Sequence, residues 1–243
     1  MREIVLDTET TGFDPETGDR IVEIGALELF NHVPTGRTYH QYINPERSMP
    51  RDAFEVHGIG PDLLDPPEEP VPGAVLLRDK PLFSAVGQQF LDFVGDAKLV
   101  IHNAAFDMKF LNAELGWAGL PTLGGDRAID TLDIARRRYP GARASLDALC
   151  QRFGIDNSDR VLHGALLDSE ILAEVYLELI GGRQPDFALH AGTSHRGASA
   201  VPDAPRLGGR SDPLPQRLTD AEAKAHAAFV ETLGPDALWK KYS

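Results

Sequence analysis

The order of apolar and polar positions predicts strands alternating with helices over residues 2–180. Apolar runs typical of strands cover residues 2–8, 20–30 and 37–43, and the short turn between the first two favours antiparallel pairing. Two shorter strands are expected further along, at 99–101 and around Ile129. An antiparallel start followed by helix–strand units is typical of an α/β domain with a mixed central sheet flanked by helices.

Periodic apolar residues and capping residues predict the helices. Val86 and Phe90 lie about one helical turn apart, in a helix that we expect Ser84 to cap. Ser145 and Gly154 are residue types that begin and end helices. Further helices are expected around Phe106, Phe110 and Leu111 and at 131–138, 145–153 and 165–180.

The C-terminal part of the chain has a different composition. Gly, Ala, Ser and Pro fill 15 of the 28 positions at 190–217, and so few large apolar residues cannot bury enough surface to fold. Thr219 with Glu222 forms a capping-box pattern and Gly234 is a stop signal, which predicts a helix over 220–233. We therefore expect a globular domain at 1–182, a flexible linker at 183–217 and a helical tail at 218–243.

Composition and charge limit the function. The 243 residues are 42% hydrophobic, enough for an ordinary core, with no signal-like segment and no apolar run that could span a bilayer. The single cysteine, Cys150, lies in an apolar stretch and is expected to be a buried side chain. These features predict a cytoplasmic protein without membrane contact. The formal charge of −13 argues against passive binding to nucleic acid, but it allows an enzyme that grips a strand end through metals.

Two carboxylates end the first predicted strand. Asp7 and Glu9 project from the same side, because alternate residues of a strand share a face. Burying two like charges together is costly unless something compensates for them. A hard divalent cation, which takes oxygen ligands, is the usual compensation. The start of the chain is therefore a candidate metal site.

Three further polar residues fall at predicted strand–helix junctions, where open α/β sheets place ligands. Asp107 opens a predicted helix, Asp168 lies early in the last helix of the domain and His163 precedes it by five positions. Taken alone, Asp107 could complement a helix dipole, Asp168 could be a solvated residue and His163 a partly buried histidine. Together with Asp7 and Glu9 they make a set of four acids and one histidine, which suits two-metal hydrolysis.

Three segments resemble the exonuclease motifs of the DEDD superfamily, in its histidine-bearing branch: 7–12, 102–107 and 163–168. Further stretches, at 56–59, 145–150 and 155–158, are similar to one family within it, the proofreading epsilon subunits of bacterial DNA polymerase III. The resemblance spans about residues 3–182 and implies a ribonuclease H-like fold, in agreement with the expected mixed sheet. The connection at 60–82 looks longer than is usual in that family, and its effect on substrate access is left open.

The resemblance implies a 3′–5′ exonuclease that removes a 3′-terminal nucleotide by hydrolysis. The family's metal ligands correspond to Asp7, Glu9, Asp107 and Asp168, which would hold two divalent ions, Mg²⁺ or Mn²⁺. His163 corresponds to the general base, a role suited to a side chain that titrates near ~6.5. Substrate-binding positions correspond to Asp7, Glu9, Asp52, His57 and Asp168, of which Asp52 and His57 would contact the terminal nucleotide. An acid in the place of Asp52 is equally suited to a turn or a cap.

Partners are implied as well. The substrate would be a single-stranded or frayed 3′ DNA end, because a metal pair in a cleft acts only on an end that has peeled away from its complement. The tail at 218–243 would bind the catalytic alpha subunit of DNA polymerase III, with Trp239 as the main contact. Gln184–Leu189 is similar to peptides that bind the sliding clamp, although it could simply pack back on the domain. Whether a small accessory subunit also binds is left open.

Two other functions compete with this one. A stand-alone RNA or single-strand 3′–5′ exonuclease, similar to ribonuclease T or oligoribonuclease, would use the same acids, but it has no need of a tethered tail. A non-catalytic adaptor that keeps only the fold should have lost at least one metal-binding acid, whereas all four are present with the histidine.

Overall fold

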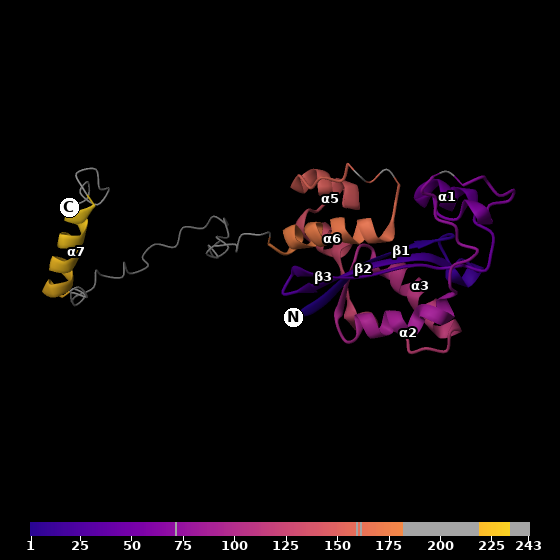
Figure 1. The fold of residues 1–243 in the computed structure, drawn as a ribbon, viewed down its shortest axis with the longest axis horizontal. Helices are drawn as coiled ribbons and strands as arrows, with labels where there is room; N and C mark the ends of the chain where they lie inside the picture. Colours follow the sequence, from indigo (N-terminus) through magenta and orange to yellow (C-terminus); the bar gives the residue numbers. More distant parts are fainter. Residues whose placement is uncertain (71, 159, 161, 182–218, 234–243) are drawn as a thin grey trace, which may run out of the picture. The chain divides into compact units, whose positions relative to one another are not determined.

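A computed structural model describes residues 1–70, 72–158, 160, 162–181 and 219–233 of the chain (Figure 1). The described residues up to 181 belong to an α/β domain, and those at 219–233 belong to a separate body that contains a C-terminal helix. None of the described helices is long and apolar enough to cross a membrane. The predicted linker and clamp-binding peptide, at 183–217, lie outside the described residues, so they remain predictions.

A five-stranded sheet forms the centre of the domain, with the strand order β3-β2-β1-β4-β5. β2 pairs antiparallel with β1 and β3, whereas β4 pairs parallel with β1 and β5. The strands are β1 (Arg2–Thr10), β2 (Ile21–Phe30), β3 (Val33–Tyr42), β4 (Lys98–Ile101) and β5 (Ala128–Asp130). The predicted mixed sheet is confirmed.

The third strand begins earlier than the sequence suggested, at Val33 instead of residue 37. Asn31 and His32 have left-handed backbone angles, with φ of 50° and 65°, which lets the chain reverse in two residues. Val33 therefore pairs directly with Phe30. Such a tight turn is difficult to predict here because the second position holds histidine instead of glycine.

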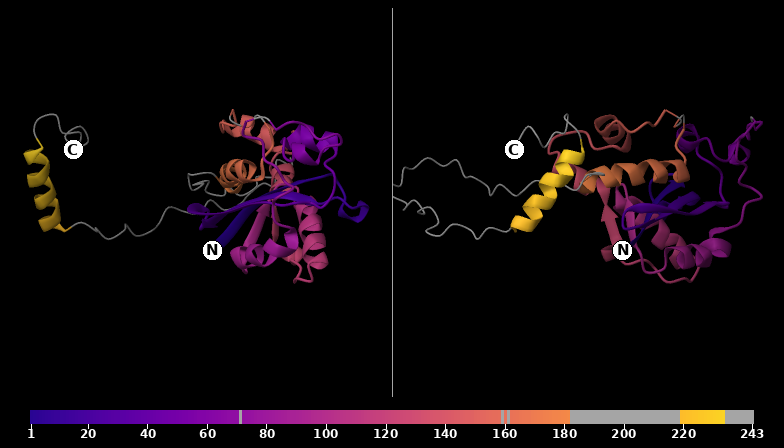
Figure 2. Two further views of the ribbon diagram at one scale, coloured as in Figure 1. Left: turned by 45° about the vertical axis from the view of Figure 1, so that its right-hand side comes forward. Right: turned by 60° about the vertical axis from the view of Figure 1, so that its left-hand side comes forward.

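Helices cover both faces of the sheet (Figures 1 and 2). α2 (Phe83–Val94) and α3 (Ala104–Trp117) lie on one face, and α4 (Thr131–Arg138), α5 (Leu146–Phe153) and α6 (Ala165–Ile180) lie on the other. Alternate residues of β1 point to opposite faces of the sheet: Ile4 and Leu6 pack with α2 and α3, and Val5 packs with α6.

Helix ends agree with the sequence signals at some positions and not at others. Ser145 caps α5 and Gly154 ends it in a left-handed conformation, as expected. The prediction that Ser84 caps α2 is wrong, because that helix begins at Phe83 with Leu82 in the N-cap position. Phe83 is only 1% exposed, so burial of its ring in the core outweighs the capping preference of serine.

Several short elements were not predicted. α1 (Arg51–His57) follows β3 and carries Asp52 in its first turn, with Pro50 as N-cap, so Asp52 is not the cap. Single 3-10 turns occur at Pro61–Leu63 and Gly125–Arg127, and a third, Pro15–Thr17, lies in the predicted turn between the first two strands. A helix of seven residues such as α1 is too short to give a periodic apolar pattern, which explains its absence from the prediction.

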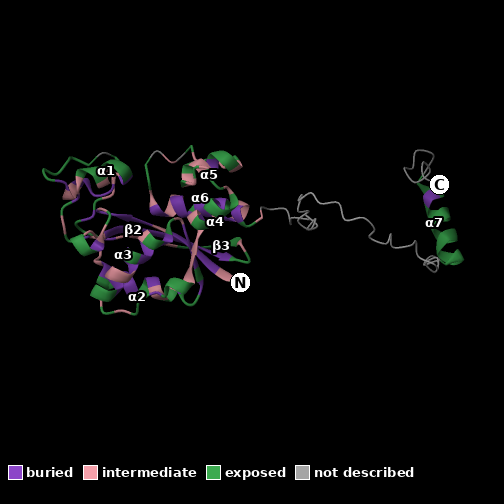
Figure 3. Ribbon diagram, turned by 180° about the vertical axis from the view of Figure 1, so that it is seen from behind, coloured by how far each residue is buried: buried purple, intermediate pink, exposed green. Residues whose placement is uncertain are grey.

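The C-terminal helix α7 spans Asp220–Thr232, close to the predicted 220–233. The predicted capping box is present, since the Thr219 side chain accepts from the Glu222 backbone and the Glu222 carboxylate accepts from the Thr219 backbone. Its surface is largely exposed (Figure 3), including 61% of Phe229, while Val230 is buried. Trp239, the expected main contact, lies outside the described residues.

Candidate active site

The end of β1 carries two of the predicted acids. Asp7 and Glu9 share the alternation of Val5, so their side chains belong to the face that α6 covers. The register with β2 shifts between Glu9 and Thr10, and irregularities of this kind often lie next to active sites, where they redirect side chains. Glu9 itself is buried.

Gly25 lets α6 approach the sheet closely beside Asp7. Gly25 is the partner of Asp7 in the β1–β2 register, and a Cβ atom on it would lie 2.1 Å from the backbone nitrogen of Leu166. Ser169 Oγ also donates a 2.9 Å hydrogen bond to the Gly25 carbonyl. The first turn of α6, which contains Asp168, is therefore held against the strand pair that carries Asp7.

Asp107 reaches the same place from the opposite layer. It lies in the first turn of α3, is buried, and accepts hydrogen bonds from the backbone nitrogen and hydroxyl of Thr8 at 3.1 and 2.8 Å. The turn before α3 is fixed by Asp130, whose carboxylate accepts from the backbone nitrogens of Asn103 and Ala104, each at 3.1 Å. Asp130 also caps α4, so its role in the structure is to hold this junction.

Burial disfavours the ionised forms of Asp7, Glu9 and Asp107. Burial raises the pKa of Asp7 well above its ordinary value, and the neighbouring carboxylates of Asp107, Glu9 and Asp168 raise it further. Burial, with Asp168 and Glu23, raises the pKa of Glu9 to about 8, and burial raises the pKa of Asp107 to about 7. Pairs of carboxylates with raised pKa values are typical of catalytic and metal-binding sites.

The donor atoms fit a hard divalent cation. One ligand atom each from Glu9, His163 and Asp168 lie within 4.8 Å of one another. Carboxylate oxygens are the ligands that Mg²⁺ and Mn²⁺ prefer, and a cation would compensate for the negative charge that is buried here. The cluster is therefore suited to divalent metal.

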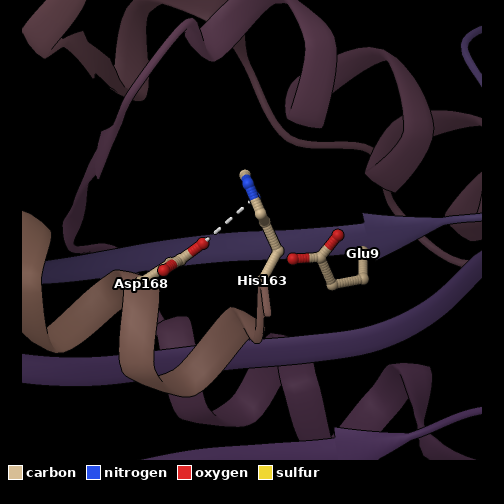
Figure 4. A group of neighbouring side chains, drawn as sticks. All are labelled: Glu9, His163 and Asp168. Atoms are coloured by element: carbon tan, nitrogen blue, oxygen red, sulfur yellow. Dashed lines mark ion pairs between the residues drawn. The ribbon is translucent and has the colours of Figure 1, made fainter. Parts of the chain in front are cut away.

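His163 lies at the edge of this cluster, just before α6 (Figure 4). Its Nδ1 is 3.6 Å from Asp168 Oδ2, and its backbone nitrogen donates to the carbonyl of Val56, 3.1 Å away. Burial and the nearby Arg160 guanidinium lower the pKa of His163, so the imidazole is neutral at neutral pH. Since 47% of the side chain is exposed, a proton accepted by the ring can pass to solvent.

Two cavities open at this place. The first, of about 580 Å³, is lined by all five predicted metal and catalytic residues: Asp7, Glu9, Asp107, His163 and Asp168. The second, of about 500 Å³, shares Glu9 and Phe13 with the first and contains both Asp52 and His57. The structure therefore brings the predicted substrate-contacting residues beside the acid cluster. Their role in binding a nucleotide remains a prediction.

His57 has a defined hydrogen-bonding arrangement in that second cavity. It is buried, and its Nδ1 accepts a 3.0 Å hydrogen bond from the backbone nitrogen of Ile59. Burial lowers its pKa to about 4, so the ring is neutral and carries its proton on Nε2. Such a histidine can donate a hydrogen bond to a ligand.

Two charged residues of the site were not found from the sequence. Arg160 lies in the first cavity with its guanidinium on Asp168. Glu23 is buried in β2, where its carboxylate accepts from the backbone nitrogen of Ala165 at 3.0 Å and lies 2.6 Å from His40 Nε2. A charged residue between Val22 and Ile24, both apolar, was the available signal for Glu23.

Sequence comparison relates the chain to known exonucleases. A family model described as an exonuclease matches residues 4–176. The DNA polymerase III subunit epsilon of Rickettsia felis is 54% identical over 192 residues, which is 78% of each chain. The same subunit of Escherichia coli K12 is 41% identical over 251 residues, covering 98% of this chain and 97% of that one.

Structural comparison supports the same fold. Exonuclease X in complex with 5′-overhanging duplex DNA matches with a TM-score of 0.53 and 24% identity, over 73% of this chain and 90% of that one. The nuclease domain of 3′hExo bound to rAMP, a member of the DEDDh family, matches with a TM-score of 0.59 and 20% identity. The match covers 74% of this chain and 91% of that one. At these identities the two structures establish the fold.

Proposed function

This chain belongs to the exonuclease family, among the epsilon subunits of DNA polymerase III, and we propose that it proofreads newly made DNA as a subunit of that polymerase. It is a 3′–5′ exonuclease, a metal-dependent phosphodiester hydrolase. The observation that carries the assignment is the convergence of four carboxylates and His163 on one cavity. The proposed substrate is a single-stranded or frayed 3′ DNA end.

The acid cluster would hold two divalent cations, Mg²⁺ or Mn²⁺. Asp7, Glu9 and Asp168 would hold one cation, Asp7 would also reach the second, and Asp107 would act directly or through water. When bound, such cations activate the attacking water and stabilise the leaving 3′-oxygen. His163 acts as the general base that takes the proton of the water, a role that its neutral, half-exposed imidazole allows.

Selectivity for errors follows from the cost of reaching the site. A terminal nucleotide must leave its complement before its phosphodiester bond can enter the acid-lined cavity, and a mispaired end does so more easily. Asp52 and His57, in the neighbouring cavity, would contact the separated nucleotide. No recognition of the base itself is needed.

A mispaired 3′-terminal nucleotide should therefore be removed faster than a paired one. Opening a correct pair costs on the order of a few kcal/mol and each 1.36 kcal/mol is a factor of ten, so we expect at least a tenfold difference. The measurement is single-turnover release from duplexes that differ only in the last pair. Single strands of DNA and RNA with one sequence are the accompanying controls. Equal rates on paired and mispaired ends would contradict the proposal, and faster cleavage of RNA would favour the RNA-trimming alternative.

The tail at 218–243 would join the domain to the alpha subunit of the polymerase. Helix α7 keeps its own capping box and exposes Phe229. A helix of 13 residues is marginal in water by itself, so a partner surface would stabilise it. The match to the Escherichia coli epsilon subunit covers 98% of this chain, so it extends into the tail. Trp239 is the proposed main contact.

One further contact belongs to the same proposal. Gln184–Leu189 would bind the sliding clamp, since a glutamine followed by spaced apolar residues is similar to clamp-binding peptides. As part of a replicative polymerase, the chain would act in the bacterial cytoplasm.

A chain that ends at residue 182 should keep its nuclease activity on single strands but fail to co-elute with the host alpha subunit. The active-site residues all lie before that point, whereas the proposed contacts with the alpha subunit and the clamp lie after it. Gel filtration with the alpha subunit, and separately with the clamp, gives the measurement. Full-length Trp239→Ala should also weaken the association with the alpha subunit. Undiminished binding by the shortened chain would show that the tail is not the tether.

A further inference from the structure

Arg160 contacts three residues of the active site at once. Its Nε and Nη2 donate to the two carboxylate oxygens of Asp168 at 2.5 and 2.7 Å, and Nη2 also donates to His163 Nδ1 at 2.9 Å. Its Nη1 donates to Asp147 Oδ1 at 2.8 Å. Only 8% of the side chain is exposed. The guanidinium is thus an integral part of the cavity lined by the acids.

These contacts use the atoms that hydrolysis requires. Both oxygens of Asp168 accept from the fork of the guanidinium, a strong and directional arrangement. Arginine can only donate, so His163 Nδ1 must be the acceptor, and the neutral ring then carries its proton on Nε2. The one lone pair of the imidazole is therefore directed at Arg160. In this arrangement His163 has no free site that could take a proton from water.

The other side of the guanidinium has a separate partner. Asp147 lies at the start of α5, is 61% exposed, and also accepts from Asn157 Nδ2 at 3.1 Å. Asp147 does not belong to the four-acid cluster, but it lines the same cavity. The guanidinium can consequently leave Asp168 and still keep a carboxylate partner.

We propose that Arg160 is an internal cation that competes with the divalent metal for Asp168, and that its departure frees Asp168 and His163 together. The inference rests on the metal-dependent hydrolysis proposed above and adds a positioning residue to it. A guanidinium and a divalent cation can each compensate for the charge of the same carboxylate. The guanidinium only donates hydrogen bonds to it, whereas a divalent cation would also take part in hydrolysis. Arg160 thereby keeps the buried acids compensated and couples release of the base to arrival of the metal.

The test compares Mn²⁺ binding by the full-length chain and its variants with isothermal titration calorimetry. Arg160→Gln should tighten binding about tenfold or more, which corresponds to about 1.4 kcal/mol. The Mn²⁺ affinity of Arg160→Lys should lie between those of the unchanged chain and Arg160→Gln, because an ammonium keeps the charge but cannot make the two parallel hydrogen bonds. Arg136→Gln is the matched control, because Arg136 is exposed and lines the same cavity. This substitution removes an equal positive charge but no hydrogen bond to Asp168.

A second measurement does not depend on any variant. The Nε–H resonance of Arg160 in the unchanged chain, followed by NMR, should move when Mg²⁺ is added, because its acceptor on Asp168 is lost. The proposed role of Arg160 would be overturned if Arg160→Gln bound Mn²⁺ more weakly than the unchanged chain, or if it changed the Mn²⁺ affinity no more than Arg136→Gln does. It would also be overturned if the Arg160 resonance did not move. Failure of the unchanged chain to bind Mn²⁺ would instead overturn the proposed metal-dependent function itself.

Discussion

Replacing Asp7 by alanine is expected to abolish hydrolysis while the chelated protein keeps or gains stability. Burial and the carboxylates of Asp107, Glu9 and Asp168 raise the pKa of Asp7, so its charge is unfavourable in the folded chain when no cation compensates for it. The same carboxylate is a proposed ligand of both cations. Bound metal contributes several kcal/mol to catalysis and each 1.36 kcal/mol is a factor of ten, so the rate should fall at least about 10³-fold.

Thermal melts in chelator, beside single-turnover cleavage, test both halves of this expectation. Asp130→Ala is the matched control, because Asp130 caps α4 and accepts from Asn103 and Ala104. Loss of a cap typically costs about 1 kcal/mol, or about 2–4 °C in a domain of this size. Asp7→Ala should show no such decrease, and added Mn²⁺ should raise its melting temperature less than that of the unchanged chain. A decrease as large as that of Asp130→Ala would make Asp7 a structural residue.

The parts of the fold that follow from local rules were predictable. Strand alternation places Asp7 and Glu9 on one face whatever the rest of the chain does, and the cap and stop residues of α5 act within a few positions. The helix at 165–180 has the bounds that its apolar period predicts. Where packing competes with a local rule, as at Phe83, the local rule fails.

The site required information that no local pattern contains. That Asp168 would lie beside Asp7 depends on Gly25, which is the register partner of Asp7 and leaves room for the backbone of α6. The contact of Arg160 with Asp168 depends on the path of the connection between α5 and α6, which has no periodicity to read. Strand alternation, the predicted strand–helix junctions and the family resemblance pointed to the acids and the histidine but not to these supporting residues.

His163→Ala is expected to lower the rate of cleavage by about 10²–10⁴-fold, the usual contribution of a general base. Mn²⁺ affinity should stay close to that of the unchanged chain, because oxygens of Glu9 and Asp168 remain at the site. His102→Ala is the control: His102 lines the same cavity but lies 2.9 Å from the hydroxyl of Thr131, with which it orders the turn before α3. We expect it to change the rate much less.

Metal affinity separates two roles that the geometry allows for His163. The ring lies close enough to Glu9 and Asp168 to share a cation with them, which would make it a ligand instead of a base. A ligand is lost together with its metal, so His163→Ala would then bind Mn²⁺ much more weakly, and saturating Mn²⁺ would restore much of the rate. A base acts after the metal has bound, so no concentration of Mn²⁺ should restore it. Slow cleavage that persists at saturating Mn²⁺ therefore identifies the base, whereas near-normal cleavage would show that neither role belongs to His163.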